Sequence, residues 1–428
     1  MHHKEVSMFK LKGFSHKERS WILYDVANSA YILTIVTVLL PLYYQTVASS
    51  IDNRTQIFSF VTAGIALTVA ISSPIVGALA NYEGNKKRFF KVFFILGLLG
   101  GVGLIIPGLN YMTLLVIFFI SSFGYNMSNV VYDAFLMDVA SEDRMDQVSS
   151  AGFGWGYIGS MVPFMIGIIP YALVTLGFLD SSLEYLSIVF AFVLALGWWA
   201  YYTIPLLKDV DQTYILEKPA RPIRDALGDI WKTFREISQY KYIFIFMFAY
   251  LLYIDVVNTV IRLATTIGTE LGVGVTTLLG VVILVQLIGF PSAILYGKAT
   301  KRFGGKRMIY FGIFIYATTI FLTFLINEDT VYLMWVVGVL VGSAQGGIQS
   351  ISRSYFAKML PMDKANEFFG FFSVFGKFSG IISPFLLGIA ISALGINSAV
   401  LVLMGPLAAG AILLAFVKPE KQEILLDE

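Results

Sequence analysis

Long apolar segments separated by short polar breaks run through the whole chain, and one longer polar stretch, Leu206–Lys241, divides them into two groups of six. Each segment is about 20 to 30 residues long, and a helix needs about 20 apolar residues to cross the ~30 Å hydrocarbon core of a bilayer. The pattern therefore predicts twelve membrane-spanning helices. We place them at Trp21–Val47, Ile57–Ala80, Phe89–Pro107, Tyr111–Ala140, Val148–Leu176, Leu183–Ile204, Tyr242–Ile267, Val273–Tyr296, Met308–Ile326, Val331–Leu360, Ala365–Leu394 and Asn397–Val417.

The expected fold class is an all-α membrane protein made of two six-helix bundles. Residues 1–205 form the N-terminal bundle, residues 206–241 a linker, and residues 242–428 the C-terminal bundle with a short tail. In the linker, apolar residues recur at helical spacing between basic ones, which predicts an amphipathic helix over Pro222–Gln239 lying on the membrane surface. An ordinary solvated linker is the alternative.

Composition supports a membrane protein and excludes several kinds of chemistry. Hydrophobic residues make up 57% of the chain and charged residues 14%, whereas soluble domains carry about 25% charge. The absence of cysteine excludes disulfides, thiolate metal sites and cysteine nucleophiles, and His2, His3 and His16 all precede the first span. We therefore expect no metal and no other cofactor, and the net charge of +2 gives no reason to expect a nucleic-acid partner.

The basic residues are distributed unevenly between the two sides of the predicted bundle. Of 30 Lys and Arg residues, 26 fall before the first span, in alternate loops, in the linker and in the tail, while the opposite loops hold only Arg54. Because Lys and Arg are enriched in cytoplasmic loops, this distribution predicts that both termini and the linker lie on the cytoplasmic side of the cell membrane.

The two halves repeat one another in sequence. The segment Tyr24–Ser29 in the first span reappears as Ile254–Thr259 in the seventh, and Pro163 and Gly167 match Pro384 and Gly388. Between spans 2 and 3, and again between spans 8 and 9, a glycine is followed by a polar residue, a second glycine and a lysine at the same spacing. The first copy is Gly77, Asn81, Gly84 and Lys86, and the second is Gly297, Lys301, Gly304 and Lys306.

This six-plus-six arrangement with its repeated loop motif resembles the major facilitator superfamily. The stretches WILYDVANSAY, VSSAGFGWGYIG, GGIQSISRS and EFFGFFSVFGK are further similar to the vacuole-effluxer-like family, whose fungal members are implicated in releasing amino acids from the vacuole. The resemblance implies a gating role for Gly77, Gly84, Lys86, Gly297, Gly304 and Lys306. The superfamily's usual Asp-Arg pair is replaced by Asn81-Tyr82 and by Lys301-Arg302, so we expect the acidic partner that locks span ends together to be missing from both copies.

Apart from charges within three residues of a span end, six charged residues fall inside the predicted spans. They are Asp25, Asp133, Asp255, Arg262, Arg353 and Lys377. A charge near the bilayer centre costs about 2.5 to 3.5 kcal/mol. Neighbours three or four positions away extend several of these charges into polar stripes. The residues that we expect to bind substrate or couple transport are Asp25, Asn28, Asn129, Asp133, Asp255, Asn258, Gln349, Arg353 and Lys377.

Two expectations concern how these charges are used. Asp133 and Arg353 lie equally deep on equivalent spans, so they are predicted to pair across the cavity when the cytoplasmic side closes. Carboxylates in a partly desolvated cavity suit proton exchange, which makes Asp133 and Asp255 the candidate proton carriers. A fixed ion-pair network that only holds the bundle together is the alternative.

The predicted function is secondary transport by alternating access, carried out by a monomer in the lipid bilayer. Export and uptake are both compatible with the sequence. Arg353 and Lys377 suit a substrate carboxylate and Asp133 and Asp255 suit an ammonium, so the expected substrate is an amino acid or related zwitterion, with protons as the coupling ion. A transporter of sugars or other neutral solutes and a non-transporting receptor or scaffold are the alternatives. A membrane enzyme is disfavoured because the densest acidic cluster, Glu142, Asp143 and Asp146, lies in a loop around Arg144.

Overall fold

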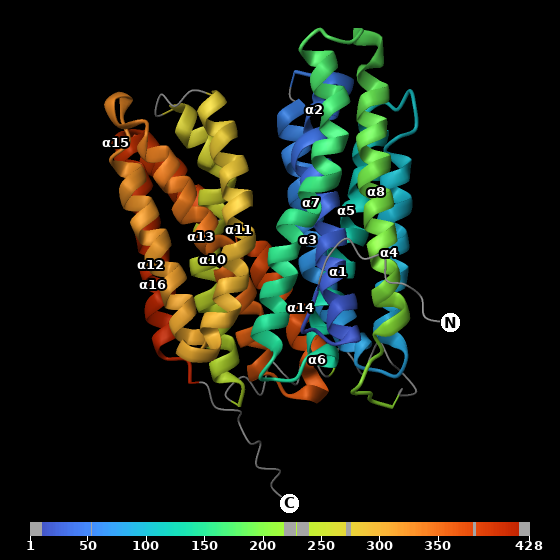
Figure 1. Cartoon of the computed structure of the whole chain (residues 1–428), viewed down its shortest axis with the longest axis vertical. Helices are drawn as coiled ribbons and strands as arrows, with labels where there is room; N and C mark the ends of the chain where they lie inside the picture. The colour runs from blue at the N-terminus through green and yellow to red at the C-terminus, as the bar shows by residue number, and fades with distance from the viewer. Residues whose placement is uncertain are drawn as a thin grey trace, which may run out of the picture.

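The computed structural model describes residues 11–52, 54–217, 228, 239–270, 275–379 and 382–418. Helices account for nearly all of this part of the chain, and within it the β-structure is limited to one isolated bridge between Tyr82 and Leu216. The helices form two groups that lie side by side, α1 to α8 in one and α10 to α16 in the other, and α14 of the second group lies against α3 of the first (Figure 1).

The first group consists of six spans. The first span is α1 (His16–Ala30), continued by the π-helical segment η1 (Tyr31–Leu39) and by α2 (Leu40–Val47). The fourth span is α5 (Tyr111–Ala134) with the short α6 (Leu136–Val139) at its end. The others are α3 (Arg54–Ala80), α4 (Asn85–Gly103), α7 (Met145–Thr175) and α8 (Glu184–Asp209), the last preceded by η2 (Ser181–Leu183).

The second group begins after the linker. Its spans are α10 (Lys241–Glu270), α11 (Val275–Phe303), α12 (Gly305–Phe324), α13 (Leu333–Met359), α14 (Ala365–Phe378) with α15 (Ile382–Ala399), and η5 (Val400–Leu403) with α16 (Met404–Ala415). The short turns η3 (Glu328–Thr330) and η4 (Met362–Lys364) precede α13 and α14. Gly395 has φ 73°, a left-handed conformation that glycine adopts without strain, and it separates spans 11 and 12.

All twelve predicted spans correspond to helices, with ends shifted by a few residues. Within the described residues, ten helices are long and apolar enough to cross a membrane by length and composition alone. The other two spans fall short for local reasons. The α4 helix begins with Lys86, Lys87 and Arg88, and span 11 is divided because Ser379 has extended backbone angles (φ −64°, ψ 134°) that end α14.

The predicted amphipathic helix Pro222–Gln239 lies almost wholly outside the described residues. The beginning of the linker is described, and it runs along the turn between α3 and α4. The Leu216 amide donates to the Asn81 carbonyl at 3.0 Å, and the Glu83 amide donates to the Leu216 carbonyl at 3.1 Å. The first part of the linker is therefore anchored to the N-terminal group of helices.

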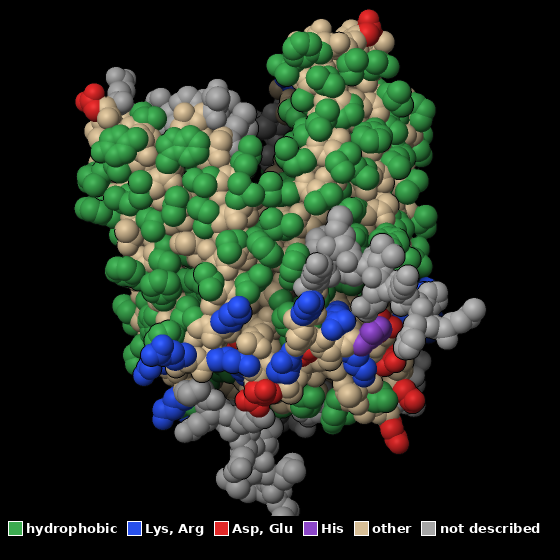
Figure 2. Space-filling view, viewed as in Figure 1, with side chains coloured by type: hydrophobic (Ala, Val, Ile, Leu, Met, Phe, Trp, Pro, Cys, Tyr) green, Lys and Arg blue, Asp and Glu red, His purple; other side chains and the backbone are tan. Residues whose placement is uncertain are grey.

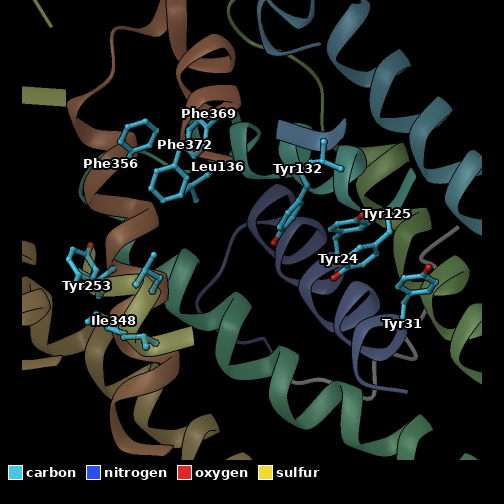
Figure 3. Packing of buried hydrophobic residues seen from close by; sticks show 14 of the residues in the cluster. Tyr24, Tyr31, Tyr125, Tyr132, Leu136, Tyr253, Ile348, Phe356, Phe369 and Phe372 are labelled. Carbon is cyan, nitrogen blue, oxygen red and sulfur yellow. The ribbon is translucent and has the colours of Figure 1, made fainter. Parts of the chain in front are cut away.

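Buried aromatic side chains fix the helices on which the candidate residues lie (Figure 3). Tyr24 and Tyr31 share hydrogen bonds of 2.9 and 2.7 Å with Ser128 and Ser121 of α5, and the rings of Trp21 and Tyr132 stack with centroids 4.6 Å apart. Because large aromatic groups bury much apolar area and each polar tip has a partner, α1 and α5 hold a fixed register.

Candidate functional site

The guanidinium of Arg353 on α13 joins the two groups of helices. Nη2 lies 3.0 Å from Asp25 Oδ2 on α1, and Nη1 lies 3.0 Å from Asp133 Oδ1 on α5. Nε donates to the Ser149 hydroxyl on α7 at 2.9 Å. Arg353 is 5% exposed and Asp25 8%. The predicted Asp133–Arg353 pair is thus confirmed, and Asp25 is a second carboxylate on the same cation.

Aromatic rings surround this cation. Arg353 Cζ lies 4.6 Å from the ring centroid of Trp21, 4.5 Å from that of Phe153 and 5.8 Å from that of Tyr132. Desolvated cation–π contacts stabilise a guanidinium by about 2 kcal/mol, and the rings also keep water away from the Arg353 guanidinium. Separating the halves would leave the buried Arg353 guanidinium without a carboxylate partner, which is unfavourable. The network therefore resists separation of the halves.

A glycine on α7 gives Asp25 the space to reach Arg353. A β-carbon added at Gly152 would overlap the Asp25 carboxylate, and one added at Gly156 would lie 2.9 Å from Ser29 Oγ. The close approach of α1 and α7 therefore depends on two glycines of the VSSAGFGWGYIG stretch.

A second layer of polar contacts between α7 and α13 lies one turn nearer the loops. Asp146 accepts a 2.6 Å hydrogen bond from the Ser354 hydroxyl and forms an ion pair with Lys358. Ser149 Oγ donates to the Ser350 carbonyl at 2.8 Å. These residues are not among those predicted from the sequence to have a role. Most of them lie in the serine-rich stretches VSSAG and QSISRS, and these stretches are the feature of the sequence that could have identified them.

The third contact between the halves joins α3 to α14. A β-carbon at Gly77 would overlap the Asn366 carbonyl, and one at Gly370 would lie 2.5 Å from the Ser73 carbonyl oxygen. The Asn366 side-chain amide donates to Asn81 Oδ1 at 2.7 Å. Two helix backbones therefore touch directly, and Asn81, which stands where the superfamily's loop motif usually has Asp, holds them together.

Lysines of the two loop motifs act within their own halves. The loop motif of the first copy has no acidic residue of its own, but Lys86 forms a buried ion pair with Asp138 at the end of α6. The carboxylate comes from span 4, which the loop motif alone does not reveal. Lys306 donates to the carbonyls of Ala415 and Val417 at 2.9 and 2.8 Å, where a cation complements the C-terminus of α16. Gly84 and Gly304 have positive φ (69° and 81°) at the starts of α4 and α12, and Gly297 packs on Ser150.

Asp255 and Asn258, on α10, have different partners from Asp25. Asp255 is fully buried and accepts a 2.6 Å hydrogen bond from the Ser383 amide, while Asn258 donates to Ser379 Oγ at 2.8 Å. Their described contacts are with the break between α14 and α15 and not with the Arg353 network.

The remaining candidates are distributed around these contacts. Asn28 donates to Asn129 Oδ1 at 3.1 Å and links α1 to α5 beside Asp25. Gln349 is half-buried on α13. Lys377 lies on α14 and Arg262 on α10, but their side chains are outside the described residues.

The two halves meet at the end of the molecule that carries Lys86, Lys306 and Lys358, which we call the basic end. Figure 2 shows Lys and Arg side chains gathered there and a hollow between the halves at the opposite end. The Arg353 network and the α3–α14 contact therefore close the basic end in this conformation. A separate cavity of about 140 Å³ lies within the C-terminal group, mostly apolar but with Gln286 and Gln345 in its wall.

Comparison with known proteins agrees with this architecture. Residues 15–424 match the family model described as "Vacuole effluxer Atg22 like". The chain is 39% identical over 416 residues to the "Uncharacterized MFS-type transporter YxiO" of Bacillus subtilis, covering 96% of each protein. It is 24% identical over 434 residues to "Autophagy-related protein 22" of Eremothecium gossypii, covering 86% of this chain and 84% of that protein.

Solved structures of similar fold are also transporters. The outward conformation of FucP, a major facilitator superfamily transporter, superposes with a TM-score of 0.71 at 14% identity and covers 95% of this chain and 99% of its own. The human organic anion transporter MFSD10 gives a TM-score of 0.68 at 13% identity, covering 93% and 98%. At these identities the likeness establishes the fold alone. The family match and the relative from Bacillus subtilis go further: the chain belongs to the vacuole effluxer Atg22-like family and is a multi-pass membrane transporter of the major facilitator superfamily.

Proposed function

We propose that this protein is a secondary transporter that carries an amino acid or a related zwitterion across the cell membrane by alternating access, with protons as the coupling ion. The observation that carries the proposal is the Arg353 network, in which one cation of the C-terminal half is bound by Asp25 and Asp133 of the N-terminal half. A transporter of this kind must break such a contact once in every cycle.

Breaking the network is costly unless each charge finds another partner. Removing one partner of a buried ion pair costs about 3 to 5 kcal/mol, much of it from the stranded charge. A substrate carboxylate can take the place of Asp25 or Asp133 on Arg353, and a substrate ammonium can take the place of Arg353 on the carboxylates. A zwitterion satisfies both at once, whereas a neutral sugar leaves the charges unpaired.

Proton coupling follows from the same chemistry. A protonated Asp133 no longer attracts Arg353 as an ion, so binding a proton favours separation of the halves. Asp133 is the more accessible of the two carboxylates, with 30% of its side chain exposed against 11% for Asp25. It is therefore the carboxylate that we expect to exchange protons with the aqueous path.

Orientation and direction complete the proposal. The basic end is placed on the cytoplasmic side because Lys and Arg are enriched in cytoplasmic loops, so the closed network would be a cytoplasmic gate. The family description of an effluxer supports export from the cytoplasm, with uptake as the alternative direction. Both directions use the same gate. We propose that one chain is the transporting unit.

The test is uptake into liposomes that contain the purified full-length protein. A radiolabelled neutral amino acid should be taken up faster with a pH gradient than without one. The unlabelled amino acid should compete, while its methyl ester and its N-acetyl derivative, each lacking one charge, should not. Equal competition by either derivative, or uptake of a neutral hexose instead, would overturn the zwitterion proposal.

A further inference from the structure

Spans 5 and 11 carry the matched Pro and Gly of the two repeats, but they differ in helix continuity. In the N-terminal half, α7 runs without interruption from Met145 to Thr175 and includes Pro163. In the C-terminal half, Ser379 ends α14 and a new helix, α15, begins at Ile382, two residues before Pro384. The matching proline is therefore not what causes the break.

Residues of α10 hold both ends of this break. Asp255 Oδ2 accepts the Ser383 amide at 2.6 Å, and Asn258 Nδ2 donates to Ser379 Oγ at 2.8 Å. Asp255, Ser379 and Ser383 are all buried. The first amides of a helix lack partners within the helix, and its N-terminus carries partial positive charge. The Asp255 carboxylate thus does for α15 what an N-cap side chain does, but from a neighbouring helix.

The helix before the break closes the basic end. Asn366 and Gly370 of α14 contact Gly77 and Ser73 of α3, and Asn366 also donates to Asn81, the residue after α3. The direction of α14 therefore determines whether the two halves touch at the basic end. The far end of α14 is held at Ser379, whose hydroxyl accepts a hydrogen bond from Asn258 on α10.

Asp25 and Asp255 are equivalent in the sequence repeat but have different neighbours in the structure. Asp25 occupies the same place in its repeat as Asp255. The helix next to Asp25 is continuous and carries Gly152, so the Asp25 carboxylate can reach past it to Arg353. The helix next to Asp255 is broken, and the Asp255 carboxylate is used to cap it.

We infer that Asp255 and Asn258 are positioning residues of the transport cycle: they fix the break in span 11 and thereby set the direction of α14, the helix that closes on α3. This assigns Asp255 a role other than carrying a proton. The inference rests on the proposed function only in taking closure of the basic end as a step of transport, and it can be tested without any substrate.

The test uses the absence of native cysteine. Spin labels at Glu83→Cys, after α3, and Met362→Cys, before α14, report the distance between the two helix ends in the full-length protein; both positions are exposed and outside the α3–α14 contact. Asp255→Ala should move molecules from the short distance to a longer one. The ratio of the two populations should change about two- to thirtyfold, the range for loss of one helix cap. Asp255→Asn keeps an acceptor oxygen and should keep the short distance.

Several results of these measurements would contradict the positioning role of Asp255. An unchanged distance in folded Asp255→Ala protein, or the same shift in Asp255→Asn as in Asp255→Ala, contradicts the positioning role. So does a changed pH profile of uptake in Asp255→Asn with the distance intact, because that result makes Asp255 a proton carrier. Should Asp255→Ala fail to fold, Asn258→Ala tests the same break, and an unchanged distance there is equally contradictory. If the distances behave as expected while no zwitterion is transported, the proposed substrate is wrong and the positioning role stands.

Discussion

Replacing Arg353 by alanine should be the most damaging single change at the contact between the two halves. The substitution leaves both Asp25 and Asp133 without their shared cation in a site walled by Trp21 and Phe153. We expect a loss of about 3 to 5 kcal/mol in the free energy of unfolding, the range for breaking a buried ion pair from one side.

The two carboxylates should differ in what their removal costs. Asp133→Ala leaves Arg353 bound to Asp25 and to Ser149, so its cost should be about 1.5 to 3 kcal/mol, the size of one charge-assisted hydrogen bond. Asp25→Ala removes the more buried partner and should cost more. In a double-mutant cycle, the Asp25–Arg353 and Asp133–Arg353 pairs should each show a coupling energy of about 0.5 to 3 kcal/mol.

The assay is unfolding of the purified protein by a denaturing detergent, followed by loss of helical circular dichroism. The control pair is Lys87 and Asp211, a 2.7 Å ion pair with side chains 34% and 72% exposed, for which at most about 1 kcal/mol is expected. Simple additivity of the Asp25 and Arg353 substitutions, or a cost for Arg353→Ala no larger than that of Lys87→Ala, would refute this account of the network.

Three further predictions concern other parts of the molecule. Gly152→Ala should destabilise the protein as Asp25→Ala does in the unfolding assay, because the new methyl group displaces the Asp25 carboxylate. Gly197→Ala, where nothing lies within 4 Å, should not destabilise it, and equal effects of the two glycine substitutions would contradict the close approach of α1 and α7. Lys86→Met should cost about 3 kcal/mol, the low end of the range for breaking a buried ion pair, because Asp138 loses its cation but keeps its hydrogen bonds from Thr213. The exposed Lys91→Met should cost almost nothing, and an equally small effect at Lys86 would mean that the buried pair is dispensable. Of single cysteines at Ser7, Asn53 and Thr213, only the one at Asn53 should react with an impermeant reagent added to intact cells, and reaction at either other site would reverse the proposed topology.

The sequence was sufficient for the fold because span length and polar breaks are local properties. Each of the twelve apolar segments became helical, and the broken span 11 was still recognised as one apolar segment. The break itself was not foreseen, because Pro384 has a counterpart, Pro163, inside a helix that continues. At the positions of Ser379 and Ser383 the first repeat has Ile158 and Val162. That these serines mark a break follows only from their contacts with the neighbouring α10.

The candidate site was only partly predictable for a related reason. Depth in the membrane can be counted along one helix, which brought Asp133 and Arg353 to the same level and gave the correct pair. The partners of a side chain on the facing helix depend on how the two halves are rotated relative to each other. The spacing of residues along one helix does not reveal this rotation. Asp25 as a second partner, Ser149 and Asp146 therefore appear only in the structure, and Asp255 turned out to contact α15 although its motif repeats that of Asp25.

The central claim is that the Arg353 network holds the basic end closed, and a distance across that end tests it most directly. Spin labels at Glu83→Cys and Arg307→Cys, both exposed and on opposite halves, measure the separation in liposomes by pulsed electron paramagnetic resonance. With Arg353 present, the short separation should dominate, and Arg353→Ala should shift most molecules to a longer separation. If Arg353→Ala keeps the short separation in folded protein, the network does not close the transporter and the account is wrong.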